Sequence, residues 1–279
     1  MIEKAYAQIA EGQLHLRRKS GREGAQSLVM MHASPSSSLS LEPLMGALGT
    51  QHDLFAFDTP CNGQSCAPAH DAPAMADFAE MIARGFKALR SKGLGRERPA
   101  LYGTHTGAHI ALEWALARPS EVRALVIDGV ALLDDETRAE FLENYAPKQV
   151  PSDTGAQFHW AWNFMRDQML FFPHYKKDYN TLRDGGTLDS EILHSLTVEV
   201  LHQLKVYHLP YEAVFRHDVR EALQKVSVPT LIIGDKESAL DPATTEVSEL
   251  VPGARTALDC ASPEAKARAI EGFLEGIPA

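Results

Sequence analysis

The segment Leu101-Tyr102-Gly103-Thr104-His105-Thr106-Gly107-Ala108 lies between an apolar run at 99–103 and a helical segment at 109–117. Glycines stand two residues before and two residues after His105. Because glycine has no β-carbon, these positions let the backbones of a strand and a helix approach closely. The central residue of such a strand-to-helix turn adopts a positive φ, which histidine tolerates better than a β-branched residue does. The segment therefore predicts a tight turn that presents His105 at the end of a strand.

Short apolar runs alternate with amphipathic segments on both sides of this turn. Most of the runs are apolar on both faces, which is typical of parallel strands covered by helices. The predicted strands are 13–17, 27–32, 52–58, 99–103, 122–128, 229–234 and 254–258. Between two of them, apolar residues recur at intervals of three and four, as on one face of a helix: Met75, Phe78, Ile82, Phe86 and Leu89. The alternation predicts βαβ units and an α/β fold with a mostly parallel sheet.

The alternation stops between residues 134 and 220, where the chain is helical in pattern and rich in aromatic residues. It resumes with the apolar run at 229–234. The sequence therefore predicts an α/β core formed by residues 1–133 and 221–279, and a helical lid formed by residues 134–220. We expect the lid to cover the carboxyl ends of the strands, where open α/β sheets bind ligands.

Four loops resemble those of α/β-hydrolase-fold proteins. Gly103–Gly107 matches the G-x-S-x-G nucleophile elbow except at its central residue. The other three are the D-x-P-G-x-G-x-S loop at 58–65, with Cys61 in place of a glycine, the HG-x-P oxyanion loop at 32–35 and the acid loop at 234–237. The resemblance implies an eight-stranded, mostly parallel sheet flanked by helices, with a helical lid. A narrower subgroup shares the G-T-H-T-G elbow and a similar lid pattern at 158–162; this likeness implies where the site lies, but no substrate.

The catalytic residues that this family usually carries are incomplete here. A hydrolase triad needs a nucleophile, a base that takes its proton and an acid that orients the base. His105 stands where the family has serine, cysteine or aspartate. The family's base histidine follows the eighth strand, but no histidine follows His217 in this chain. The sequence therefore disfavours a standard serine-hydrolase mechanism.

Three interpretations of His105 are open from the sequence. It is a general base or nucleophile, kept neutral by the helix N-terminus and oriented by Asp128 or Glu237. It is a metal ligand together with His109 at helical i, i+4 spacing, although no third ligand is evident. Or it is the relic of a lost active site. We adopt the first interpretation, with no metal and no cofactor; near alternatives for the orienting acid are Asp235 and Asp241.

Further residues complete the expected site. Backbone amides near Ser34 and at Thr106 are expected to form an oxyanion hole. In the lid, His159 is the expected substitute for the missing base. Arg166 is expected to hold a substrate carboxylate or other anion, with an internal pair to Asp167 as the alternative. The remaining expected substrate contacts are His32, for which shaping its own loop is the alternative, and Trp160 and Phe171, for which helix packing is the alternative.

Composition limits the class of protein. The formal net charge is −10 with mixed acidic and basic residues, which disfavours nucleic acid as a partner. The sequence has no run of about 18 apolar residues, so we expect no membrane span. The charged N-terminal segment does not resemble a signal peptide, and a cytoplasmic location is therefore expected. The three cysteines, Cys61, Cys66 and Cys260, are expected to be reduced structural thiols. A homodimer is expected only as the commonest oligomer.

These observations lead to two functional hypotheses. The first is a cofactor-independent enzyme that acts on a small, partly apolar ester, lactone, thioester or carbonyl compound between core and lid. Carbon–carbon bond cleavage, as by a lyase, fits the same residues. The second is a non-catalytic ligand-binding or interaction protein built on the hydrolase scaffold.

Overall fold

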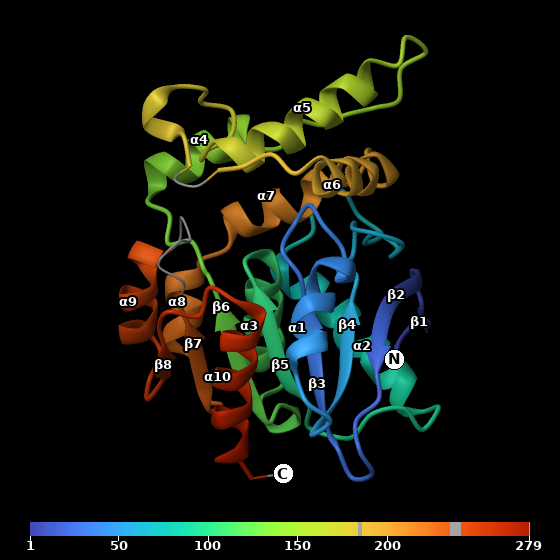
Figure 1. The fold of residues 1–279 in the computed structure, drawn as a ribbon, viewed down its shortest axis with the longest axis vertical. Helices are drawn as coiled ribbons and strands as arrows, with labels where there is room; N and C mark the ends of the chain where they lie inside the picture. Colours follow the sequence, from blue (N-terminus) through green and yellow to red (C-terminus); the bar gives the residue numbers. More distant parts are fainter. Residues whose placement is uncertain (184–185, 235–240, 279) are drawn as a thin grey trace.

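The computed structural model describes residues 1–183, 186–234 and 241–278. Within these residues a single eight-stranded sheet runs in the order β1-β2-β4-β3-β5-β6-β7-β8 (Figure 1). The pairs β1/β2 and β2/β4 are antiparallel, and every other neighbouring pair is parallel. The predicted mostly parallel sheet is therefore confirmed. Its strands are β1 (Ile2–Ile9), β2 (Gly12–Lys19), β3 (Gln26–Met31), β4 (His52–Phe57), β5 (Ala100–Thr104), β6 (Ala124–Asp128), β7 (Thr230–Ile233) and β8 (Arg255–Ala257).

Helices cover both faces of the sheet. On one face, α2 (Met75–Arg90) and α3 (Thr106–Ala117) pack on alternate strand residues such as Leu101. On the other face, α1 (Glu42–Ala47) and α10 (Pro263–Glu275) pack on the intervening residues, such as Tyr102. The short helices α8 (Val219–Gln224) and α9 (Asp241–Leu250) add to the first face. This two-sided burial explains why the central strands are apolar on both faces.

Strand β1 was not among the strands predicted from the sequence. It forms the edge of the sheet and pairs only with β2 among the described strands. Its residues alternate between exposed and buried positions, and Tyr6 is exposed. Because an edge strand buries only part of its surface, its apolar pattern is too weak to separate it from a polar N-terminal segment.

Four helices between β6 and β7 form a separate layer over one edge of the sheet (Figure 1). They are α4 (Asp135–Asn144), α5 (Ala156–Leu170), α6 (Ser190–His202) and α7 (His208–Arg216). The layer has a core of its own, made mostly of aromatic side chains that include Phe141, Tyr145, Phe164, Tyr207, Tyr211 and Phe215. We call residues 134–220 the lid; its boundaries stay those predicted from the sequence. Short 3-10 helices cover Ser38–Leu41, Pro119–Glu121 and Tyr179–Thr181.

Hydrogen bonds attach the lid to the loops of the core. Gln203 Nε2 donates to the carbonyl oxygen of Gly63 at 2.8 Å. The hydroxyl of Ser37 donates to the carboxyl group of Glu199 on α6. Burial raises the pKa of this carboxyl group. No helix in the described part of the chain is both long and apolar enough to span a bilayer.

Candidate active site

The turn between β5 and α3 has the backbone geometry that its two glycines predicted. His105 has φ 50° and ψ −116°, so its positive φ is confirmed. A β-carbon on Gly103 would lie 2.2 Å from the carbonyl oxygen of Gly107, and one on Gly107 would lie 2.2 Å from that of Met31. Helix α3 begins at Thr106, directly after the turn. We call residues 103–107 the elbow; it holds His105 at the carboxyl edge of β5.

The imidazole of His105 is accessible to solvent, with Nδ1 2.9 Å from the hydroxyl oxygen of Thr104. Desolvation by the surrounding protein lowers the pKa of His105. The negative charge of Asp128 acts against this shift, whereas the positive charges of Lys266 and Arg183 lower the pKa further. His105 is therefore neutral at pH 7, and a neutral imidazole can accept a proton or attack a carbonyl carbon.

Asp128, the expected orienting acid, lies beside the elbow but does not bond directly to His105 in the described contacts. Its side chain is buried, and Oδ2 accepts hydrogen bonds from the Tyr102 hydroxyl and from Lys266 Nζ, the latter at 2.7 Å. The backbone carbonyl oxygen of Asp128 accepts the N–H of His105 at 3.2 Å. The expected direct pair between the Asp128 carboxylate and the imidazole is therefore replaced by contacts with Tyr102 and Lys266.

The other candidates for the orienting acid cannot be placed. Glu237 and Asp235 lie outside the described residues, and the side chain of Asp241 does so as well. Glu237 stays a prediction from the sequence.

The two loops expected to supply oxyanion-hole amides lie next to each other. The N–H of Ser34 points to the Thr106 hydroxyl oxygen at 3.4 Å. Thr106 is the first residue of α3, so its own N–H has no partner within the helix. The hydroxyl of Tyr211, from the lid, donates to the carbonyl oxygen of Ser34 at 3.0 Å. These contacts bring Ser34 and Thr106 together beneath Tyr211 of the lid, and Thr106 directly follows His105 in the sequence.

His32 has no free ring nitrogen with which to bind substrate. It is fully buried, and Nδ1–H donates to the carbonyl oxygen of Ala33 at 2.7 Å. Nε2 accepts the N–H of Thr59 at 2.9 Å. Burial lowers the pKa of His32, in keeping with an imidazole that stays neutral. The expectation of a substrate contact is corrected by this geometry, which fits the alternative that His32 shapes its own loop.

The structure does not bring His159 to the elbow. Helix α5 buries the face that carries Ala161, Phe164 and Met165, and His159 lies on the opposite, exposed face. Its expected role as a substitute base is therefore not supported. Arg166 is also directed away from that buried face, and its guanidinium bonds to Asp167 at 2.6 Å. This is the internal pair that the sequence offered as an alternative to anion binding.

The lid aromatics Trp160 and Phe171 contribute to packing within the lid. The ring of Trp160 stacks on Phe164, with centroids 4.8 Å apart, and also contacts Tyr207. Phe171 is half-buried and forms an isolated β-bridge with Leu182. These contacts match the helix-packing alternative. No described contact connects either side chain to His105.

Two positively charged residues near the elbow were missed by the sequence analysis. Lys266 lies on α10, just after the segment where the family's base histidine would stand, so its position gave a usable signal. Arg183 belongs to the lid, and its guanidinium lies 5.7 Å from the ring centroid of Phe172. Arg183 is exposed in a polar loop, where nothing in the sequence indicates that it lies near the elbow. Both charges lower the pKa of His105, and the negative charge of Asp128 opposes them.

His109 does not join His105 in a common site. Its Nδ1 lies 2.8 Å from Nδ1 of His217, whose Nε2 lies 2.7 Å from a carboxylate oxygen of Glu113. Burial lowers the pKa of His109 strongly. Among the residues that the structure describes, no group of three or more histidine, cysteine, aspartate or glutamate side chains could hold a metal ion.

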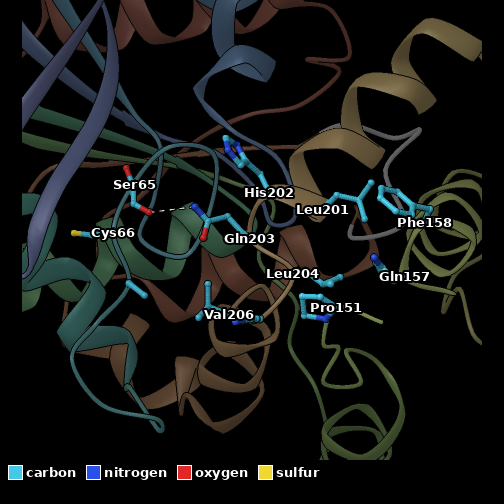
Figure 2. Close-up of a pocket in the computed structure, with 12 residues that line it drawn as sticks. Ser65, Cys66, Pro151, Gln157, Phe158, Leu201, His202, Gln203, Leu204 and Val206 are labelled. Carbon is cyan, nitrogen blue, oxygen red and sulfur yellow. Dashed lines mark hydrogen bonds between the residues drawn. The ribbon is translucent and has the colours of Figure 1, made fainter. Parts of the chain in front are cut away.

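A cavity of about 460 Å³ lies between the lid and the loop after β4 (Figure 2). The hydrogen bond from Gln203 Nε2 to the carbonyl oxygen of Ser65, at 3.3 Å, crosses this region. The other lining residues include Cys66, Pro151, Phe158 and the segment 201–206. Of the site residues expected from the sequence, none that the structure describes lines it. The cavity is therefore distinct from the elbow.

The chain is similar to known proteins in both sequence and fold. A model of the alpha/beta hydrolase fold matches residues 26–257. The chain is 28% identical over 212 residues to a putative carbamate hydrolase, RutD, of Klebsiella pneumoniae, which covers 75% of this chain and 73% of that protein. It is 31% identical over 133 residues to 2-hydroxy-6-oxononadienedioate/2-hydroxy-6-oxononatrienedioate hydrolase 2 of Pseudomonas putida, covering 44% of each chain. The structure of epoxide hydrolase A from Mycobacterium thermoresistibile superposes with a TM-score of 0.73 at 19% identity, over 100% of this chain and 99% of that one.

Proposed function

Because the chain belongs to the α/β-hydrolase fold family and is a hydrolase, we propose that it hydrolyses a small, partly apolar carbonyl compound with His105 in place of the usual triad. The substrate class is an ester, lactone, thioester or activated ketone. The observation that carries the proposal is a solvent-accessible, neutral imidazole at the tip of the elbow, beside the amides of Ser34 and Thr106.

In the proposed reaction the imidazole of His105 acts as a general base. It accepts a proton from a water molecule, whose oxygen attacks the carbonyl carbon of the substrate. The amides near Ser34 and at Thr106 stabilise the oxyanion that forms. As the tetrahedral intermediate collapses, the bond to the leaving group breaks and the imidazolium returns its proton to that group. Direct attack by His105 on the carbonyl carbon is the variant of this scheme in which the imidazole is the nucleophile.

The charges around the elbow support a substrate that carries a negative charge. Lys266 and Arg183 both act electrostatically on His105, from the core and from the lid respectively. Arg183 replaces Arg166 as the proposed anion-binding residue, because Arg166 is paired with Asp167. A guanidinium group binds a carboxylate through two parallel hydrogen bonds.

Cleavage of a carbon–carbon bond is the second candidate function. It is favoured by the likeness to the Pseudomonas putida hydrolase, whose name describes a 2-hydroxy-6-oxo compound with two carboxylates. The same base and oxyanion hole would add water to the ketone carbon. The bond to the neighbouring carbon would then break as the tetrahedral intermediate collapses to a carboxylic acid, and the departing carbon would keep the electron pair and take the proton from the imidazolium. The positive charge of Arg183, which acts on His105 from the lid, would suit an anionic substrate.

The test is a panel of small esters, lactones, thioesters, carbamates and 1,3-diketones, each with and without a carboxylate. Replacing His105 with glutamine is expected to lower kcat/KM for the best substrate by about 10²–10⁴-fold, the usual contribution of a positioned base. His159→Gln is the matched control, because this histidine is exposed on the far face of α5. Undiminished turnover by the His105→Gln variant, with the fold intact by circular dichroism, would refute the proposal.

The pH dependence gives an independent check on the same histidine. Because the pKa of His105 lies below its usual value of 6.5, the wild-type kcat/KM is expected to be flat around pH 7. It should fall only at more acidic pH, as the imidazole becomes protonated and loses its lone pair. A rate that halves at or above pH 7 on acidification would contradict a neutral His105.

A further inference from the structure

A second cavity, of about 370 Å³, lies at the amino-terminal ends of the parallel strands. It is lined by Gln26 and His52, the first residues of β3 and β4, and by Arg123, which directly precedes β6. Leu274 and Glu275, at the carboxyl end of α10, line it as well. This end of α10 lies away from the lid, whereas the elbow is at the opposite, carboxyl edge of the sheet (Figure 1). The cavity is therefore separate from the candidate active site.

Arg123 is buried in the wall of this cavity without a negatively charged partner. It is only 5% exposed, and the one hydrogen bond described for its guanidinium joins Nη2 to the carbonyl oxygen of Leu274, at 3.3 Å. Nε is buried and has no acceptor. In residues 1–183, 186–234 and 241–278, no carboxylate forms an ion pair with Arg123. Because a guanidinium has five N–H donors and a full positive charge, most of its binding capacity is unused.

The surroundings of Arg123 make this uncompensated charge costly. Burial lowers the pKa of Arg123, and the positive charge of Arg98 lowers it further. Both effects oppose the charged form of the guanidinium. A buried charge is normally paired with a counterion, since removal from water is otherwise unfavourable. An anion in the cavity would supply the missing counterion.

His52 is a second side chain of the cavity wall that lacks a partner. It is 6% exposed, and its Nδ1 is buried with no hydrogen bond. Desolvation lowers the pKa of His52, the positive charge of Arg123 lowers it further, and the negative charge of Glu271 acts against both. The imidazole is therefore neutral at pH 7 and has one N–H to donate.

The remaining charges of the wall restrict the kind of anion. Arg22 is exposed and adds a positive charge, but Glu271 and Glu275 are acidic. One carboxylate oxygen of Glu271 accepts the N–H of Gly49 at 2.7 Å. Two acidic side chains repel a dianion such as phosphate more strongly than a monoanion. A carboxylate is a monoanion whose two oxygens match the planar guanidinium, and the cavity is large enough for a small organic molecule.

We infer that this cavity binds a small organic carboxylate, whose oxygens accept hydrogen bonds from the guanidinium of Arg123 and from His52. The inference does not rest on the proposed function, because none of these residues belongs to the elbow or the lid. The competing explanation is that Arg123 only caps the carboxyl end of α10 through the Leu274 carbonyl. That explanation predicts no ligand.

The probe is sodium propionate, which replaces sodium chloride at constant ionic strength in a titration of the whole chain. Binding is followed by ¹H–¹⁵N NMR of the ring of His52 and of the N–H groups of Arg123, assigned by the loss of signals in variants. We expect saturable shifts of both sets of signals, with a Kd of about 1–10 mM, because few atoms of the probe make contact. Inorganic phosphate should bind more weakly. The absence of a saturable shift would overturn the site, and tighter binding of phosphate would overturn its assignment to a carboxylate.

Variants separate a binding site from a structural arginine. Arg123→Lys keeps the charge but loses the planar fork, and should weaken propionate binding about tenfold. Because Arg123 is buried, an exposed position supplies a variant that leaves the fold undisturbed. Glu275→Gln removes an exposed negative charge from the wall and should tighten binding about two- to fivefold. Glu264→Gln, at the other end of α10, is its matched control and should leave the affinity unchanged. Equal affinities of the Glu275→Gln variant and the wild type would contradict the site.

A positively charged residue on each side of the molecule locates the bound probe. Arg22→Gln should weaken propionate binding about two- to fivefold, since Arg22 is an exposed residue of the wall. Arg183→Gln removes the anion contact proposed at the elbow and should leave the shifts of His52 unchanged. If Arg183→Gln abolishes the shifts and Arg22→Gln has no effect, the probe binds at the elbow and the inference is wrong.

Discussion

Replacing Gly107 with alanine is expected to destabilise the folded chain by about 3 kcal/mol or more, the upper part of the range for added atoms in a packed interior. The added β-carbon would lie 2.2 Å from the carbonyl oxygen of Met31, and 2.8 Å from that of His32. Both obstacles are backbone atoms at the end of β3, which no change of side-chain rotamer can move. Relief requires α3 to shift away from the sheet, which would also displace Thr106 and His105.

The measurement is urea unfolding followed by circular dichroism, with Gly272→Ala as the matched control. Gly272 lies within α10, and an added β-carbon there would meet nothing within 4 Å. Since alanine is the better helix former, that variant should be as stable as the wild type or more stable by about 0.5–1 kcal/mol. Equal stability of the Gly107→Ala variant and the wild type would show that the close approach of α3 and β3 is wrong.

Replacing Asp58 with asparagine is expected to cost about 3 kcal/mol, the range for removing one partner of a buried charged network. The carboxylate is buried and accepts the N–H of Ser38 at 2.8 Å, that of Gln64 at 2.9 Å, and a contact from His15 Nδ1 at 2.8 Å. An asparagine amide would turn an NH₂ group toward one of these donors and leave it without an acceptor. The loop after β4 should therefore lose its fixed shape.

The same network predicts how stability depends on pH. Burial by itself would raise the pKa of Asp58, but the hydrogen bonds from His15, Ser38 and Gln64 lower it below the ordinary 3.8. A carboxyl group whose pKa is lower in the folded state stabilises the fold above its unfolded pKa. This stabilisation is lost as the pH falls below about 3.8 toward the folded value.

The stability difference between the wild type and Asp58→Asn should therefore be constant near neutral pH and shrink in acid. The control is Asp135→Asn, since the Asp135 side chain is fully exposed beside Arg138. That variant should change the free energy of unfolding by less than about 0.5 kcal/mol. A difference for Asp58→Asn that stays the same down to pH 2 would contradict a depressed pKa.

The residues around the candidate active site show where prediction from sequence succeeded and where it failed. The proximity of Asp128 to the elbow followed from pattern alone, because neighbouring parallel strands end at one edge of the sheet. The hydrogen-bond partners of the Asp128 carboxylate did not follow from the pattern. Lys266 is 138 positions away along the chain. Its place after the segment of the family's base histidine suggests that it lies near the elbow, but does not identify it as the partner of Asp128. Which of Tyr102, Lys266 and His105 binds the Asp128 carboxylate depends on the positions of all three side chains in the folded chain.

The lid was harder to predict than the core, for a related reason. Helix α5 carries aromatic residues on both faces: Phe158 and Trp162 are exposed, whereas Phe164 is buried. Its sequence has no single apolar stripe to show which face packs inward, so the direction of His159 could not be inferred. Only the burial pattern of the folded helix shows that His159 points into solvent, away from the packed face of α5.

The layered sheet and the elbow follow from the amino-acid sequence alone, because both depend on short-range physics. Apolar runs select buried strands, and the missing β-carbons of Gly103 and Gly107 permit the contact between strand and helix. The hydrogen-bond partners of the polar side chains, by contrast, depend on the folded arrangement of the whole chain. Both ring nitrogens of His32 form hydrogen bonds with the backbone, at Ala33 and at Thr59. The carboxylate of Asp128 accepts hydrogen bonds from Tyr102 and Lys266. Hydrogen bonds are short and directional, so these choices required the final positions of segments far apart in the chain.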